Sequence, residues 1–353
     1  MKNERSWNAY SMVALPALTA IALSTSGCLG GGSSSSSGGG GSGLADFVSA
    51  AEIYEGDYSG PEDLVELDTV DTAAQAMDLA YLSERAEAVI FTLEQLVSGV
   101  DPEDTPVTIP GDRPDVDPPG TLVYESSGDA DGFSETWTME GTYGFCTEKM
   151  DTSGPVCIIG EVAREETFES SGGSVTVARA ETSFDGLKAT FRGGKIEMTG
   201  IELAAGDSSS NENRTAMAVD LVFTSDDDKG IEEAEIRLLW DQQATGVDIH
   251  NQQDFSRTST MDIATPLLGG RIEAEQTHTQ GQNGFFEDFT CTNGLFGNDY
   301  EDAASGRVTM THDGPEIVAD LNATGECEKF VISGGQSGTA TLLDTLFTGK
   351  SGN

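Results

Sequence analysis

Three histidines are the residues of this chain best suited to proton transfer, and they lie far apart in the sequence. His250, His278 and His312 fall on, or at the ends of, three different predicted strands. None belongs to an HExxH pair, and no GxSxG nucleophile turn occurs outside the Gly/Ser-rich segment near the N-terminus. Gly206-Asp207-Ser208 is similar to the first three residues of an esterase motif but lies in a polar loop. We therefore expect no catalytic residues; a hydrolase would need one of the three histidines to meet a carboxylate in a cleft.

Carboxylates are the second group with potential chemistry, because oxygen ligands bind calcium. Asp129 and Asp131 share one loop, and Asp226, Asp227 and Asp228 share another. Neither loop completes a twelve-residue calcium loop with its distal glutamate. We interpret both as solvated turns and expect neither a bound metal nor a cofactor.

The five cysteines divide into one near the N-terminus and four in the body of the chain. An even number in an exported chain predicts two disulfides, although four cysteines allow three pairings. Cys146 with Cys157 would join one hairpin, and Cys291 with Cys327 would close a longer loop. No CxxC spacing is present, which argues against structural zinc.

The N-terminus has the layout of an export signal. Lys2 and Arg5 precede the apolar run Met12–Leu23, which is too short to cross a bilayer core that needs about 20 residues. The small residues before Cys28 resemble the lipobox of bacterial lipoproteins, except that Thr25 stands where that motif usually has leucine. The resemblance implies that residues 1–27 are a signal peptide and that Cys28 is lipidated, with palmitate among its acyl chains. A plain secretory signal is the alternative.

A Gly/Ser-rich segment follows the lipobox directly. Residues 28–43 have the composition of a flexible tether, with a root-mean-square span of about 20 Å. In the Gram-negative lipoproteins that this resembles, an aspartate after the cysteine retains the protein in the inner membrane, and this chain has Leu29. The resemblance therefore implies a lipid anchor in the outer membrane, where two acyl chains hold stably.

The charge of the chain restricts its partners. There are 61 acidic and 18 basic side chains, for a formal net charge of -43. This charge excludes nucleic acid, because binding to phosphates needs clustered lysine and arginine. We interpret the acidity as adaptation to a salty habitat, where a Debye length of roughly 4 Å screens self-repulsion. A haloarchaeal lipoprotein would share the acidity and the tether, but the twin-arginine signal that many of them carry is missing here.

The rest of the chain divides into a helical segment at 44–100, a proline-rich linker at 101–119 and a β domain at 120–353. Within the first, the spacing of apolar residues predicts an amphipathic helix over 72–100, with Thr72 and Gln75 as its capping box. Its apolar stripe, which we expect to pack on the protein's own sheet, comprises Leu79, Leu82, Ala86, Val89, Leu93, Leu96 and Val100. Six of the eleven prolines lie in the linker, which we expect to be extended and polyproline-like.

Alternation of apolar and polar residues after Gly120 predicts roughly a dozen antiparallel strands. Trp137 and Met139 share one face, for example, and turn residues separate the runs. We therefore expect a mainly β fold, either a sandwich or a strongly curved sheet, with the N-terminal helix packed on it. The segments 142–146 and 265–270 also look similar to those of proteobacterial lipoproteins with Gly/Ser tethers, and that resemblance implies no activity.

These observations predict an outer-membrane lipoprotein with a structural or binding role in the cell envelope. Its expected partners are the membrane, through the anchor, and either an envelope protein or a hydrophobic ligand. The broad architecture is similar to that of periplasmic lipoprotein carriers, in which helices close a half-barrel, and this implies the alternative of a ligand cavity between sheet and helix. An envelope hydrolase is the second alternative.

Overall fold

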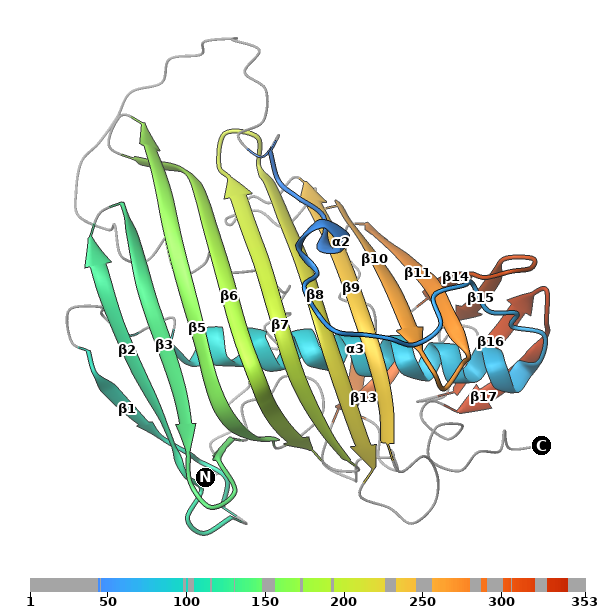
Figure 1. Ribbon diagram of the computed structural model, residues 1–353, viewed down its shortest axis with the longest axis horizontal. Helices are drawn as coiled ribbons and strands as arrows, with labels where there is room; N and C mark the ends of the chain where they lie inside the picture. Colours follow the sequence, from blue (N-terminus) through green and yellow to red (C-terminus); the bar gives the residue numbers. More distant parts are fainter. Residues whose placement is uncertain are drawn as a thin grey trace, which may run out of the picture.

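One wide antiparallel sheet forms the body of the protein (Figure 1). The computed structural model describes residues 44, 46–97, 100, 105–114, 116–129, 131–147, 156–171, 174–191, 194–225, 233–245, 256–279, 287–290, 301–305, 307–320 and 329–341. Within them the sheet has 15 strands, and the strands follow one another in space in almost the order of the chain. The mainly β prediction is confirmed; the sandwich alternative is wrong, since these strands form a single open sheet.

The strands lengthen toward the middle of the sheet. The first group consists of β1 (Val107–Pro110), β2 (Thr121–Asp129), β3 (Gly132–Glu140), β4 (Phe145–Thr147), β5 (Val156–Ser171), β6 (Ser174–Phe191), β7 (Gly194–Asp207) and β8 (Glu212–Ser225). The second consists of β9 (Glu233–Thr245), β10 (Ser256–Thr265), β11 (Gly270–Thr279), β14 (Arg307–Thr311), β15 (Ile317–Asp320), β16 (Lys329–Gly334) and β17 (Gly338–Thr341). A separate pair joins β12 (Glu287–Thr290) to β13 (Glu301–Ser305).

Period-two alternation gives the sheet two different faces. Trp137 and Met139 are buried as predicted, and so are the expected partners on later strands, such as Val219 and Ile272. Their pairing register lines them up in rows across the sheet on the side that we call the helix face. The opposite side, which we call the strap face, is exposed over much of β2–β7.

The helix α3 (Val70–Val97) crosses the helix face (Figure 1). Its 28 residues extend about 42 Å, enough to pass behind roughly nine strands at about 4.8 Å each. The buried side chains of its apolar stripe belong to the same core cluster as the sheet residues. The N-terminal cap lies three residues before the predicted one, because Thr69 and Thr72 exchange hydrogen bonds between backbone N–H and side-chain oxygen, at 3.1 and 3.2 Å.

A strap of extended chain, residues 46–65, runs over the strap face and contains only the short helix α2 (Ala50–Ile53). It crosses β8 to β11 before the chain reaches α3 (Figure 1). At its end Leu64 makes a parallel bridge with Arg271 of β11. The sequence predicted only a helical segment here and missed this crossing.

The proline-rich linker contributes a strand to the sheet. Its residues Val107–Pro110 form β1, which pairs with β2 at the edge, so the sheet begins before the predicted boundary at 120. The peptide bonds before Pro106 and Pro118 are cis. None of the helices in the described part of the chain is long and apolar enough to cross a membrane.

Candidate functional site

The helix face is divided into an apolar half and a polar half by the register of its strands. Rows on the side of α3 are apolar, and one of them reads Tyr124, Trp137, Val162, Phe184, Gly200, Val219, Leu238, Ile263 and Ile272. Two residues further along the strands, the row reads Glu135, Arg164, Thr182, Glu202, Met217, Trp240 and Met261. The next row adds Glu166, Ala180, Ala204, Thr215, Gln242 and Ser259. Charged and hydroxyl side chains are therefore aligned inside the protein.

Arg164 is the centre of the polar half. It is 3% exposed, and it pairs through Nη1 with Glu94 of α3 and through Nη2 with Glu166 at 2.6 Å. Its guanidinium also lies 5.9 Å from the ring centroid of Trp137. Because Glu94 comes from the helix, this ion pair fastens the polar half of the sheet to α3. We call Tyr124, Glu135, Trp137, Arg164 and Glu166, with Glu94, the Arg164 cluster.

Acidic groups outnumber the single guanidinium in the Arg164 cluster. Burial raises the pKa of Glu166 to about 7, and this effect exceeds the opposing attraction of Arg164. The carboxylates of Glu135 and Glu94 raise it further. The Tyr124 hydroxyl donates a hydrogen bond to Glu135, and burial raises the pKa of that phenol. The cluster can therefore bind or release one proton near neutral pH.

Several buried donors on this face have no hydrogen-bond partner within the described residues. They include the indole Nε1 of Trp137, the Nε of Arg164 and the hydroxyl of Thr215. Unsatisfied buried donors each cost about 1–3 kcal/mol unless something else accepts from them. They lie in adjoining rows of β3, β5 and β8 and mark the polar half as a place where a ligand with acceptor atoms could bind.

Two arginines hold the strap on the other face. Arg237 contacts Glu62 of the strap at 2.6 Å and Asp262 of β10 at 3.0 Å. Arg271 contacts Asp262 at 2.8 Å and donates from Nε to the backbone oxygen of Glu62 at 2.9 Å. The guanidinium of Arg237 also lies 5.7 Å from the ring centroid of Tyr58, so the strap is bound by charge and by ring contact.

Hydrogen bonds that the strap donates to sheet carboxylates fix its first part. The Tyr54 hydroxyl donates to Asp220 of β8 at 2.6 Å, and burial with this bond raises the pKa of Tyr54 to about 12. The backbone N–H of Ala50 donates to Asp241 of β9 at 2.8 Å. Burial raises the pKa of Asp241. The strap is therefore attached at both ends and in its middle.

The predicted histidines do not come together in the described structure. His312 is buried, and its Nδ1 accepts from the backbone N–H of Leu67 at 3.1 Å while Nε2 faces the carbonyl oxygen of Pro315 at 2.6 Å. Both ring nitrogens thus have structural partners. His278 of β11 pairs through its backbone with Arg257 of β10, and His250 lies outside the described residues.

Of the two predicted acidic turns, the one at Asp129 and Asp131 lies within the described residues, and its carboxylate has a structural role. Asp129 Oδ1 accepts from the N–H of Asp131 at 2.9 Å and shapes the turn between β2 and β3. Asp226, Asp227 and Asp228 lie outside the described residues. Within the described part of the chain no group of three or more acidic, histidine or cysteine side chains is arranged to hold a metal.

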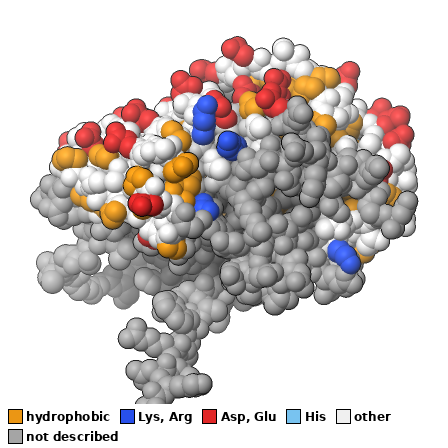
Figure 2. All heavy atoms as spheres, turned by 90° about the horizontal axis from the view of Figure 1, so that it is seen from below, with side chains coloured by type: hydrophobic (Ala, Val, Ile, Leu, Met, Phe, Trp, Pro, Cys, Tyr) orange, Lys and Arg blue, Asp and Glu red, His pale blue; other side chains and the backbone are white. Residues whose placement is uncertain are grey.

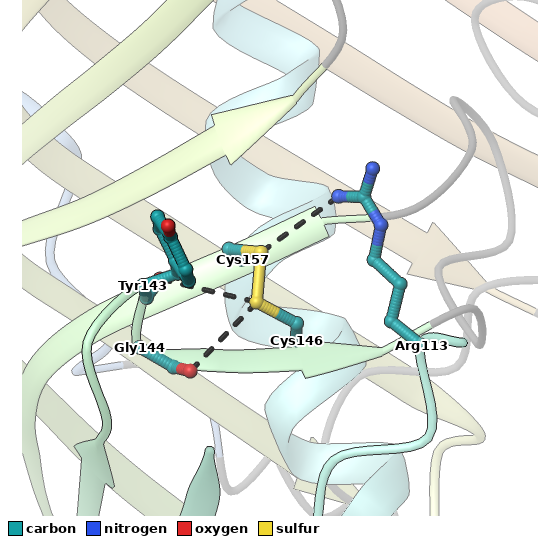
Figure 3. The surroundings of a disulfide bond; sticks show 5 residues. All are labelled: Arg113, Tyr143, Gly144, Cys146 and Cys157. Atoms are coloured by element: carbon teal, nitrogen blue, oxygen red, sulfur yellow. Dashed lines mark hydrogen bonds between the residues drawn. A yellow bond between two sulfur atoms is a disulfide. The ribbon is translucent and has the colours of Figure 1, made fainter. Parts of the chain in front are cut away.

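The predicted disulfide between Cys146 and Cys157 is confirmed (Figure 3). It joins β4 to β5 at directly opposed positions, and both cysteines are buried. The Nη1 atom of Arg113 lies 3.7 Å from Cys157 Sγ, and Cys146 Sγ lies 3.7 Å from the carbonyl oxygen of Gly144. Cys28, Cys291 and Cys327 lie outside the described residues.

Acidic side chains are spread widely over the visible described surface (Figure 2). This distribution agrees with the net charge of -43 and singles out no ligand. Comparison of the chain with family models, with curated proteins and with solved structures finds no match.

Proposed function

We propose that this protein is a lipid-anchored lipoprotein of the outer membrane with a structural or binding role in the cell envelope, and that it is not an enzyme. The observation that carries the proposal is the strap. The chain that follows the tether is fastened to the sheet by Arg237, Arg271, Asp220 and Asp241. Such an attachment suits a body that is held by its N-terminus.

The position of the strap supports a display function. It crosses β8 to β11, and Phe47 near its start packs with Val177 and Ala205 of β6 and β7, while the strap face of β2, β3 and β5 stays largely exposed. A tether of 16 residues has a root-mean-square span of about 20 Å, which is enough to keep a folded body clear of lipid headgroups. The lipid anchor and the tether thus position a broad, wet surface for contact with other envelope components.

Lipid attachment is tested by comparing the full-length protein with Cys28→Ser and with Ser33→Ala as the matched tether control. We expect a diacylglyceryl mass and outer-membrane fractionation for the wild type and Ser33→Ala, and both lost in Cys28→Ser. A wild-type protein without the lipid mass, or with unchanged fractionation of Cys28→Ser, would refute the anchor.

A carrier of a hydrophobic ligand is the second candidate, and the unpartnered donors of Trp137 and Thr215 favour it. An amphiphile with acceptor atoms would satisfy them. Native mass spectrometry of the soluble Cys28→Ser protein distinguishes the two functions. A non-covalent lipid mass that Thr215→Val loses and Thr199→Val retains would establish a carrier; an empty protein supports the display role.

A further inference from the structure

Both ring nitrogens of His312 contact backbone groups, and those groups fix the protonation state of the ring. Its Nδ1 atom lies 3.1 Å from the backbone nitrogen of Leu67, which can only donate a hydrogen bond. Its Nε2 atom lies 2.6 Å from the carbonyl oxygen of Pro315, which can only accept one. The ring is therefore neutral, with its proton on Nε2 and the lone pair of Nδ1 directed at Leu67.

The Nδ1 atom takes the place of a backbone carbonyl in a short ladder of hydrogen bonds. Val65, at the end of the strap, donates to the carbonyl oxygen of Arg271 at 3.1 Å and accepts from the N–H of Asp313 at 2.8 Å. Leu67, two residues further along the chain, makes the next contact through His312. The imidazole thus continues the attachment of the strap toward the start of α3.

The ring of His312 is enclosed by the chain. His312 is buried and Leu67 is 1% exposed, so water does not replace the bond between them. A Cβ added to Gly314 would lie 2.4 Å from Cε1 of His312, so the turn packs closely on the ring. A half-turn of the ring would present a carbon atom to Leu67 in place of Nδ1. Rotation of the ring therefore supplies no other acceptor.

Charged side chains of the described residues near the ring occupy exposed or half-buried positions. They are Glu66, Asp68 and Asp71 from the start of α3 and the chain before it, Arg271 and Glu273 from β11, and Asp313 and Glu316 from the turn before β15. Those before α3 and in β11 alternate with the buried Leu67 and Ile272, and Asp313 follows the buried His312. They therefore point away from the helix face. A positively charged ring would lie on the apolar face, at a cost in free energy.

We propose that His312 is a pH-sensitive latch. When Nδ1 takes up a proton, two N–H groups oppose each other with their nitrogens 3.1 Å apart, and the bond to Leu67 is lost. The junction between the strap and α3, residues 66–69, is then released from the turn between β14 and β15. An ordinary imidazole takes up this proton at about pH 6.5. The latch is closed above this pH and opens as the pH falls below it, independently of a lipid anchor or a display role.

Hydrogen–deuterium exchange of the full-length protein at pH 7.5 and pH 5.0 tests the latch, with exchange times scaled for the intrinsic effect of pH. We expect the amide of Leu67 to be protected at pH 7.5 and to lose protection about tenfold at pH 5.0, because a buried donor loses its acceptor. The amide of Val219 in the central strand β8 should keep its protection at both values, which distinguishes local release from unfolding of the sheet.

Three variants separate the latch from other effects of pH. Asparagine carries an oxygen close to the position of Nδ1 and does not titrate, so His312→Asn should protect the junction at both pH values. Phenylalanine offers no acceptor, so His312→Phe should expose the junction at both. His278→Asn is the control in β11 and should keep the pH dependence of the wild type. Equal protection of the wild type at the two values, or the same loss in His312→Asn, overturns the proposal.

The tautomer of the ring gives a test that needs no substitution. In the wild type with 15N-labelled histidine, we expect one imidazole to be held entirely in the form with its proton on Nε2 at pH 7.5. Protonation of its Nδ1 should follow the same pH curve as the loss of protection at Leu67. If no imidazole is held in this form, or if protection is lost without protonation of Nδ1, the latch is refuted, whether or not the variants fold.

Discussion

Glu166 makes the stability of the protein depend on pH in a direction that can be predicted. Its pKa is about 7 in the folded protein and 4.5 for an ordinary glutamate, because burial and the nearby carboxylates outweigh the attraction of Arg164. Below pH 4.5 the group is protonated in both states and contributes nothing. Between pH 4.5 and 7 the unfolded chain releases the proton first, so stability falls as pH rises. Well above pH 7 the ionised Glu166 lowers the free energy of unfolding by its full amount, about 3 kcal/mol.

The substitution Glu166→Gln removes this penalty, because glutamine imitates the protonated carboxyl. We expect the variant and the wild type to have similar free energies of unfolding at pH 4. At pH 8 the variant should be more stable by about 3 kcal/mol. Urea unfolding at a series of pH values measures the difference, and comparison at the same pH cancels the effect of carboxylates that do not interact with residue 166.

Glu165→Gln is the matched control, because Glu165 is the neighbouring residue on the exposed strap face. Its free energy of unfolding should follow that of the wild type at every pH. The reasoning is refuted if Glu166→Gln has the same pH dependence as the wild type, or if it is the less stable protein at pH 8.

Three other substitutions test the contacts of the strap, the disulfide and His312. Arg237→Met should cost about 2 kcal/mol and speed proteolysis within the strap, since charged hydrogen bonds are lost; unchanged cleavage would contradict the strap contacts. Replacing Cys146 and Cys157 by serine should cost about 3 kcal/mol in urea unfolding, as expected for a closed loop with a sequence separation of 11. An unchanged midpoint would show that the bridge adds no stability. His312→Phe should cost about 1–3 kcal/mol, because the N–H of Leu67 loses its acceptor; equal thermal stability would contradict that role.

Local patterns were sufficient to predict the sheet. Alternation identified the faces of β3 and β8, and glycine-rich turns separated the strands, because both signals depend only on residues close in sequence. The disulfide between Cys146 and Cys157 was predictable for the same reason, since its cysteines flank one hairpin. The proline-rich segment was misinterpreted because Val107–Pro110 is a short edge strand, where proline is tolerated.

The candidate sites could not be predicted, because their contacts join distant parts of the chain. Arg164 and Glu166 look like ordinary charged residues of an exposed strand, and only the position of α3 and the register of β3 show that they are buried together. The contact between His312 and Leu67 likewise joins residues 245 positions apart in the chain. A signal was present: Arg164 and Glu166 follow the apolar Val162 at two-residue spacing, which places all three on one face of β5.

The order of the strands has a consequence for the order of folding. Since neighbouring strands from β5 to β11 are also consecutive in the chain, each can pair with its predecessor as the polypeptide emerges. The strap cannot form its contacts in this order. Tyr54 bonds to Asp220, 166 residues later in the chain, and Glu62 bonds to Arg271, 209 residues later. The strap is therefore fastened to the body only after the central hairpins exist, which makes its fastening a late step of folding.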